Sequence, residues 1–255
     1  MVKCVYKNNP LIEVIIQLRF PKLLALASND PVDFQEAIRG EFPHYQLTIE
    51  NHQEISFSVN DNSPVTSINQ RQPEKNHCFI SEDGKYKINL TSSFISISTL
   101  SYTKWEDMQN RLSGPLEAFE SIYKPPFYER IGLRYIDAYS RKRLHLEGTP
   151  WKDLIGENWI GPLASIEENK VVLSGNDIEY VLDDEKSRAK IHCGLGKLND
   201  DPETVFIIDS DFIQIATIDK SAKDTALEYL HKNAKLFIED VITRKLHEAM
   251  MPEYE

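Results

Sequence analysis

The stretches Ile16-Gln17-Leu18-Arg19-Phe20 and Ile131-Gly132-Leu133-Arg134-Tyr135 decide how this sequence folds. In both, apolar residues alternate with polar or small ones, as expected of a β-strand with one buried face and one polar face. The two stretches also match each other position by position. A second matching pair, residues 92–99 and 210–217, follows them in the same order. This order of matches indicates an internal duplication.

The spacing between the matching stretches supports the duplication. Ile16 precedes Phe94 by 78 residues and Ile131 precedes Phe212 by 81 residues, so the alignment equates Phe94 with Phe212. A helical pattern follows the second stretch in both halves. We therefore predict an α+β protein of two related units, residues 1–126 and 127–255. Each unit would be an antiparallel sheet held by a long C-terminal helix, and a pseudo-twofold axis would relate the two within one body.

The two predicted helices carry apolar residues at steps of three and four. The first begins at Thr103 with the spacing of a capping box, and Gly114-Pro115 should kink or break it. The second begins with the same spacing at Ser221, and its pattern continues to about Met250. A helix of that length, at about 1.5 Å per residue, would cover a whole sheet.

The remaining chain reads as strands separated by irregular segments. Residues 60–77 are rich in Asn, Ser, Pro and Gln and poor in apolar residues, which predicts a loop. Residues 140–170 are irregular, with Trp151 and Trp159 as expected anchors. Strands are expected at 12–20, 45–50, 54–59, 77–81, 85–89, 94–100, 127–139, 170–174, 177–183, 187–195 and 204–217.

Composition limits the class of protein and its partners. Of the 255 residues, 41% are hydrophobic and 27% are charged, which is typical of a soluble globular chain. The 40 acidic residues outnumber the 29 basic ones and give a net charge of -11. A nucleic-acid surface needs a basic face, so nucleic-acid binding is disfavoured and a protein partner is favoured.

Cysteine usage and the first residues suggest the compartment. Cys4, Cys78 and Cys193 are few and far apart, and no C-x-x-C pair is present to hold zinc. Such a count fits free thiols in a reducing cytosol. The N-terminal MVKCVYKNNP lacks the apolar core of a signal peptide. We expect a cytoplasmic protein without a membrane anchor.

Arginines at matching positions are the main candidates for ligand binding. Arg19 and Arg134 occupy equivalent places on the two similar strands. An arginine in a strand needs carboxylates, phosphates or carbonyls for its guanidinium, which suggests an anion or nucleotide near the junction of the units. Arg130, Tyr135 and Asp137 belong to the same candidate cluster. The structural alternative is a set of ion pairs with acids on neighbouring strands.

The acidic residues give a weaker candidate site. Asp209 and Asp211 form a D-x-D pair that could bind magnesium in a nuclease or hydrolase. The sequence has no nucleotide-binding glycine loop, no G-x-S-x-G and no H-E-x-x-H. His192-Cys193 is the nearest approach to a nucleophile and base, and a core thiol is the simpler interpretation. We expect no catalytic residues, no bound metal and no cofactor.

A resemblance to a known family rests on three segments. Residues 9–20, Arg130–Asp137 and the strand around Asp209-Ser210-Asp211 resemble a sporadically distributed bacterial family. The resemblance extends over nearly the whole chain, although Asp137 stands where Asn is common in such proteins. The family carries no established activity to transfer. Its patchy distribution implies mobile genes, with roles in phage defence or toxin neutralisation.

Three functional hypotheses follow. The first is a non-enzymatic binding or regulatory subunit that recognises a protein encoded nearby, within a mobile defence or toxin-neutralising system. The second is a sensor of a nucleotide or another small anion at the junction of the units. The third is a divergent metal-dependent nuclease or hydrolase. The sequence leaves the oligomeric state open.

Overall fold

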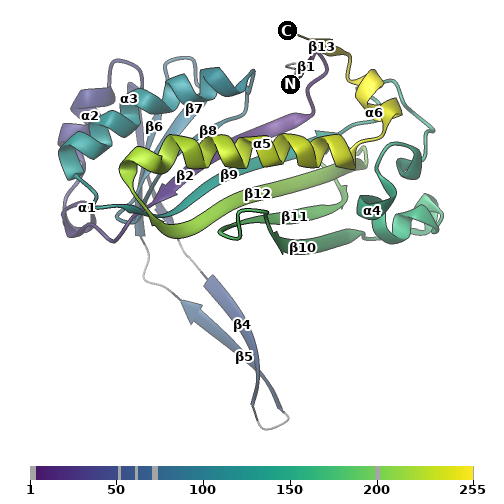
Figure 1. Ribbon diagram of the computed structural model, residues 1–255, viewed down its shortest axis with the longest axis horizontal. Helices are drawn as coiled ribbons and strands as arrows, with labels where there is room; N and C mark the ends of the chain where they lie inside the picture. Colours follow the sequence, from purple (N-terminus) through teal and green to yellow (C-terminus); the bar gives the residue numbers. More distant parts are fainter. Residues whose placement is uncertain (1–3, 51–52, 61–62, 71–73, 199–201, 255) are drawn as a thin grey trace.

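One large antiparallel sheet organises the chain (Figure 1). The computed structural model describes residues 4–50, 53–60, 63–70, 74–198 and 202–254. In spatial order the nine strands are β10 (Gly175–Val181), β11 (Ser187–Gly196), β12 (Val205–Ile218), β9 (Tyr128–Tyr139), β2 (Leu11–Arg19), β8 (Phe94–Thr99), β7 (Tyr86–Leu90), β6 (Glu74–Ile80) and β3 (His44–Glu50).

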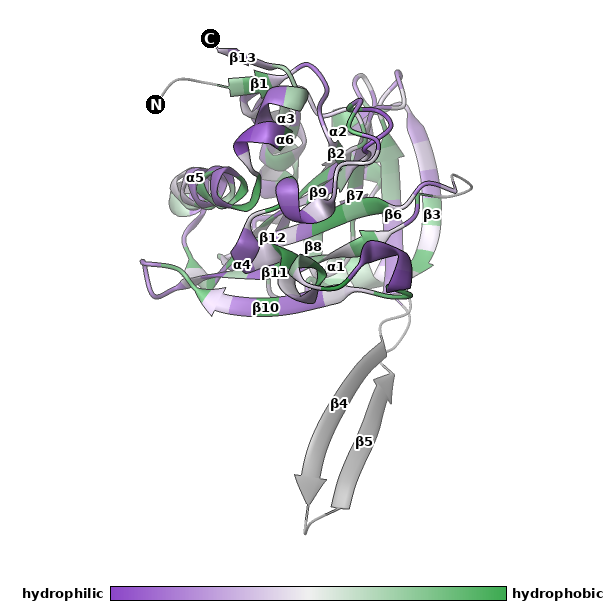
Figure 2. Cartoon of the chain, turned by 90° about the vertical axis from the view of Figure 1, so that its right-hand side faces the viewer, coloured by the Kyte–Doolittle hydropathy of each residue, from purple (hydrophilic) through white to green (hydrophobic). Residues whose placement is uncertain are grey.

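Two long helices, α3 (Trp105–Tyr123) and α5 (Lys223–Val241), lie along one face of this sheet (Figure 1). The sheet curves around them from β10 to β3, so that the helices occupy the inner side of the curve (Figure 2). Their apolar stripes face the sheet, as the three-and-four spacing predicts. The buried members are Trp105, Met108, Leu112, Pro115, Leu116 and Phe119 on α3, and Ala226, Leu227, Leu230, Ala234, Phe237 and Val241 on α5.

Shorter elements complete the chain. The helices α1 (Leu24–Ser28), α2 (Val32–Ile38), α4 (Glu157–Ile160) and α6 (Arg244–Ala249) lie in the connections. Near the two ends of the chain, β1 (Cys4–Tyr6) pairs with β13 (Pro252–Tyr254). Separately, β4 (Gln53–Asn60) pairs with β5 (Ser63–Gln70) as a two-stranded sheet. Within the described ranges, no helix combines the length and apolar character of a membrane span.

The two stretches that dominate the sequence pair with each other at the centre of the sheet. β2 and β9 run antiparallel, with Ile16 opposite Leu133 and Leu18 opposite Ile131. Gln17 lies opposite Gly132. Each central strand then has the last strand of its own half as its other neighbour, β8 beside β2 and β12 beside β9. The predicted α+β class and the predicted central strands are confirmed.

The sequence alignment of the second pair of stretches is wrong by one residue in the sheet. Ile95 lies opposite Leu18, whereas Phe212 lies opposite Leu133. The register therefore equates Ile95, not Phe94, with Phe212. Phe94 instead lies opposite Arg19. Because side chains alternate between the two faces, a slip of one residue moves a side chain to the other face.

Two predictions about strands and loops are also wrong. Residues 60–77 contain β5 and the first part of β6, not a continuous loop. β6 has a partner on each side, β3 and β7, and this pairing stabilises a strand whose composition alone suggests a loop. The strand expected at 170–174 is absent, because β10 begins only at Gly175 and Val172 and Leu173 are exposed.

The last helix ends earlier than predicted. α5 stops at Val241, and Ile242 adopts an extended conformation that forms a β-bridge with Ile155. The Thr243 side chain then caps α6 by accepting a hydrogen bond from the Leu246 N–H. A backbone partner from the 140–170 segment therefore interrupts a helical pattern that continues in the sequence. The single helix predicted from Ser221 to about Met250 is therefore replaced by two helices, of 19 and 6 residues.

The predicted helix starts and the predicted break also need correction. α3 begins at Trp105, and the Thr103 hydroxyl donates to Asp107 Oδ2 at 2.7 Å. Ser221 lies in a short 3₁₀ turn (Lys220–Ala222) before α5, where the Asp219 side chain accepts its backbone N–H. α3 continues through Pro115, whose ring is buried in the core, so packing compensates for the lost backbone hydrogen bond.

A pair of leucines on α5 tests how strongly the helix is held against the sheet. Leu230 is fully buried, whereas Leu236 is 44% exposed. Leu230→Ala should lower the free energy of unfolding by about 2–5 kcal/mol, because it removes apolar contacts and leaves a cavity. Leu236→Ala should change it by less than about 1 kcal/mol. Urea unfolding of both variants measures this, and equal effects would contradict the described packing of α5.

Candidate ligand site

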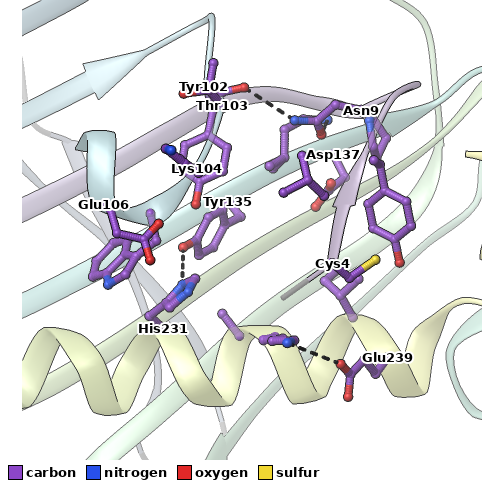
Figure 3. Close-up of a pocket in the computed structure, with 18 of the residues that line it drawn as sticks. Cys4, Asn9, Tyr102, Thr103, Lys104, Glu106, Tyr135, Asp137, His231 and Glu239 are labelled. Atoms are coloured by element: carbon purple, nitrogen blue, oxygen red, sulfur yellow. Dashed lines mark hydrogen bonds and ion pairs between the residues drawn. The ribbon is translucent and has the colours of Figure 1, made fainter. Parts of the chain in front are cut away.

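A cavity of about 220 Å³ lies between the helices and the centre of the sheet (Figure 3). Its floor is β9, and its walls are β1, α5 and the segment that leads into α3. It therefore occupies the junction between the first and second halves of the chain. Tyr135 and Asp137 point into it from β9, and His231 and Glu239 border it from α5 (Figure 3).

Asp137 is the most unusual group in the cavity. It lies on the helix-facing side of β9, where its neighbours on the same face, Tyr135 and Tyr139, are buried with it. Only 3% of Asp137 is exposed, and its Oδ2 atom has no hydrogen-bond partner among the residues that the structure describes. Burial raises the pKa of this carboxyl to about 7, because the charged form loses its hydration.

Tyr139 is a second buried polar group without a partner. It lies two residues beyond Asp137 and on the same face, and its hydroxyl has no hydrogen bond within the described part of the chain. Residues two apart on a strand are roughly 7 Å apart. Because buried polar groups in proteins are almost always hydrogen-bonded, two such groups on one wall mark this part of the cavity as a candidate binding surface.

Aromatic rings form the wall next to α3 and α5. The Tyr135 hydroxyl is 2.8 Å from His231 Nδ1, and the Tyr102 ring packs edge-on against the Tyr135 ring. Trp105 stacks on His231, with 4.4 Å between ring centroids and an angle of 8°. The Trp105 indole N–H donates to Glu228 at 2.7 Å. Burial lowers the pKa of His231, so its ring is neutral at physiological pH.

The N-terminal strand β1 forms the opposite wall. Tyr6 on β1 hydrogen-bonds to His247 Nδ1 at 2.8 Å, and His247 Nε2 is 3.0 Å from the Tyr254 hydroxyl. These bonds and the pairing of β1 with β13 hold the N-terminal strand beside the cavity. Asn9 Nδ2 donates to the Tyr102 carbonyl at 3.4 Å, which ties the start of β2 to the segment before α3.

The sequence-predicted cluster divides between the two faces of the sheet. Tyr135 and Asp137 line the cavity, whereas Arg130 and Arg134 alternate with them and point to the outer face. Arg19, opposite Arg130 in the register, lies on the outer face too. The five residues therefore do not form a single site.

On the outer face, the two arginines of β9 are held by the two aspartates of β12. Arg130 Nη2 donates to Asp211 at 2.7 Å, and its Nη1 donates to Gln17 at 2.9 Å. Arg134 forms a two-bond ion pair with Asp209. Both are ion pairs with acids on a neighbouring strand, which is the structural alternative to ligand binding that the sequence left open. An added Cβ at Gly132 would lie 2.6 Å from Arg130 Nη1, so this glycine leaves room for the guanidinium to cross the strand.

Arg19 differs from the other two arginines. Among the described residues its guanidinium has no ion pair or hydrogen bond, and it contributes to lowering the pKa of Arg130 by charge repulsion. Asp209 and Asp211 lie close to Arg134 and Lys190, and Asp177, Glu179 and His192 border the same shallow pocket on the outer face. Within the described ranges, no three His, Cys, Asp or Glu side chains are grouped to hold a metal ion.

Much of the cavity escapes prediction from the sequence. The signal for Asp137 is visible, because it interrupts the buried face of a strand otherwise formed by Leu133, Tyr135 and Tyr139. His231 similarly interrupts the apolar stripe of α5. Tyr6 and Tyr102 have no local sequence signal, because they reach the cavity only when β1 and the segment before α3 pack beside β9.

No protein-family model matches the chain. No curated protein matches it significantly.

Asp137 gives the folded protein a distinctive dependence on pH. Its folded pKa is about 7 and its unfolded pKa is about 3.9, so the folded state binds the proton more tightly. The folding stability attributable to this group should fall as pH rises from about 4 to about 7, by up to about 4 kcal/mol. Asp137→Asn should remove this loss and raise the melting temperature at pH 8.

The control is Asp177→Asn, which removes an exposed carboxylate from the outer face. Melting temperatures measured from pH 5 to pH 8 compare the three proteins. A wild type and an Asp137→Asn variant with the same pH dependence would show that Asp137 is not a buried, unpartnered acid.

Proposed function

We propose that this chain is a non-enzymatic binding protein that holds a small molecule in the cavity at the junction of its halves. The observation that carries the proposal is the pair of buried groups without hydrogen-bond partners, Asp137 Oδ2 and Tyr139 OH. Retaining an unpaired buried carboxyl costs stability, and such costs are typical of binding sites. A ligand that donates a hydrogen bond to Asp137 would recover that cost on binding.

The position of the cavity suggests a regulatory role. Its lining comes from β1 and β9 and from the elements next to α3 and α5, so a ligand would touch both halves of the chain. β1 is held mainly by β13 and by the bond from Tyr6 to His247. Ligand contacts with β1 would therefore stabilise the pairing of the two chain ends, and a partner that contacts these ends would respond to the ligand.

We also propose that the two halves arose by duplication. The support is the strand order, which reads β2-β8-β7-β6 outward on one side and β9-β12-β11-β10 on the other. Each half contributes four strands to this order, and both halves arrange them in the same way. Counted along the chain, the first strand lies at the centre of the sheet and is followed outward by the fourth, the third and the second. In both halves a long helix follows the fourth strand. The antiparallel pair of β2 with β9 would contain the pseudo-twofold axis.

A protein partner is the second proposed function, because β3 is an open edge of the sheet. Tyr45, Leu47 and Ile49 alternate along it and are about half exposed. An edge strand has free backbone groups that can pair with a strand of another protein. The net charge of -11 favours a basic partner. We propose a protein encoded nearby, in a mobile defence or toxin-neutralising system.

Binding in the cavity is tested by thermal shift with a panel of small amines, alcohols, amides and carboxylates. At least one class should raise the melting temperature of the wild type in a saturable way. Ile238→Phe places a larger side chain in the cavity from α5. The ligand concentration needed for half of the maximal shift should then rise at least tenfold. Leu236→Ala, on the same helix but exposed, is the control. Shifts that Ile238→Phe leaves intact would place binding elsewhere.

Partner binding at the edge is tested by co-purification with the product of the neighbouring gene. Leu47→Lys puts a charge on the exposed edge and should abolish a stoichiometric complex. Val172→Lys makes the same change at an exposed residue outside the sheet and should leave the complex intact. Equal co-purification of both variants would exclude the β3 edge, and no complex with the wild type would refute the partner hypothesis.

A further inference from the structure

The chemical class of the ligand follows from the charge inside the cavity, and this inference rests on the proposed binding function. Asp137 is the acid buried in the floor of the cavity. Tyr135 and Tyr139 beside it stay neutral, because burial raises the pKa of both hydroxyls. His231 is neutral as well, for the reason given above. An ionised Asp137 therefore leaves one uncompensated negative charge at the floor.

The charged groups at the rim do not compensate Asp137. Lys235 on α5 has Glu239 one turn away, with 4.0 Å between Nζ and Oε1. Lys104 and Glu106 provide one charge of each sign at the approach to α3. The rim is thus balanced in formal charge, and the chain as a whole carries a net charge of -11. Its field favours the approach of cations over anions.

The walls around the carboxyl suit an organic cation. Tyr6, Tyr102 and Trp105 line the space together with Tyr135 and Tyr139. Aromatic faces attract ammonium groups, most strongly where water is excluded. An anion would instead meet a buried carboxylate, which repels it. At about 220 Å³ the cavity is smaller than the roughly 300–1,000 Å³ of sites for drug-sized ligands.

We propose that the cavity binds a small protonated amine whose N–H donates to Asp137 Oδ2 and whose apolar part packs against the tyrosines and Trp105. The ammonium supplies the charge and the donor that the floor lacks. Tyr139 OH, on the same wall, accepts a second hydrogen bond from the ammonium group. The ionised Asp137 then repels carboxylates and phosphates of the same size.

Three probes of the same shape test the charge requirement. They are 2-phenylethylamine, 2-phenylethanol and 3-phenylpropanoate, which carry a positive, a neutral and a negative end. Calorimetry on the full chain at pH 8 should show binding of the amine at least tenfold tighter than of the alcohol. The carboxylate should show no binding.

Asp137→Asn tests the named contact. It should weaken amine binding at least tenfold and leave the alcohol within about threefold, while its melting temperature without ligand stays equal to or above that of the wild type. Asp177→Asn removes an equal charge from the outer face and should bind the amine as the wild type does. A role of Asp137 in folding alone would instead lower the melting temperature of Asp137→Asn.

The dependence on pH gives an independent readout. The amine stays protonated from pH 5 to pH 8, so its affinity should rise with the ionisation of Asp137, up to tenfold per pH unit below about 7, and then level off. The slope should vanish in Asp137→Asn. Among the described residues, the other titratable groups that face Asp137 or its neighbours come from every element around the cavity. They are Cys4 and Tyr6 on β1, Tyr102, Lys104 and Glu106 before and on α3, Tyr135 and Tyr139 on β9, Cys193 on β11, and Glu228, His231, Lys235 and Glu239 on α5.

The outcomes separate this inference from the proposed function. Tighter binding of the alcohol or the carboxylate than of the amine, lost in Ile238→Phe, would keep the cavity as a ligand site and overturn the amine. Amine binding that Asp137→Asn leaves unchanged would also overturn it. If no probe binds and no member of the wider panel produces a shift sensitive to Ile238→Phe, both the inference and the proposed function are wrong.

Discussion

The antiparallel pairing of β2 with β9 is the constraint on which the rest of the structure depends. It joins two halves of the chain into one sheet and fixes which side chains face the helices. Leu18 lies opposite Ile131, and every second residue from these two along β2 and β9 points to the same side, into the core. The other set, including Arg19 and Arg130, must then lie on the outer face, because alternation in a strand allows no other arrangement.

The same alternation explains why one strand contributes to two different environments. β9 sends Arg130 and Arg134 to the outer face, where Asp211 and Asp209 neutralise them. It sends Tyr135, Asp137 and Tyr139 inward, where no described basic side chain is paired with the carboxyl. Charges are thus paired on one face, and an unpaired buried acid is kept on the other. That contrast within a single strand is why we assign ligand binding to the inner face.

The cavity exists because the helices do not close over the whole sheet. α3 and α5 cover most of the inner face, and the chain ends fill the remaining side through the pairing of β1 with β13. The wall formed by β1 is held by a pairing with β13 of only three residue pairs. It is therefore the part of the cavity that depends on the fewest backbone hydrogen bonds, and its bond from Tyr6 to His247 links it to α6.

The sequence by itself determined the central strands, the two helical stripes and the α+β class, because these follow from the periodicity of apolar residues. It did not determine where α5 ends, since that depends on the bridge between Ile242 and Ile155. It also failed for residues 60–77, where β6 forms because β3 and β7 flank it. The alignment of Phe94 with Phe212 missed the register by one residue, since hydrogen bonding between strands sets the register.

Only the tertiary structure separated the arginines from Asp137 and brought Tyr6, Tyr102 and His231 around it, because contacts between distant segments have no signature in local sequence.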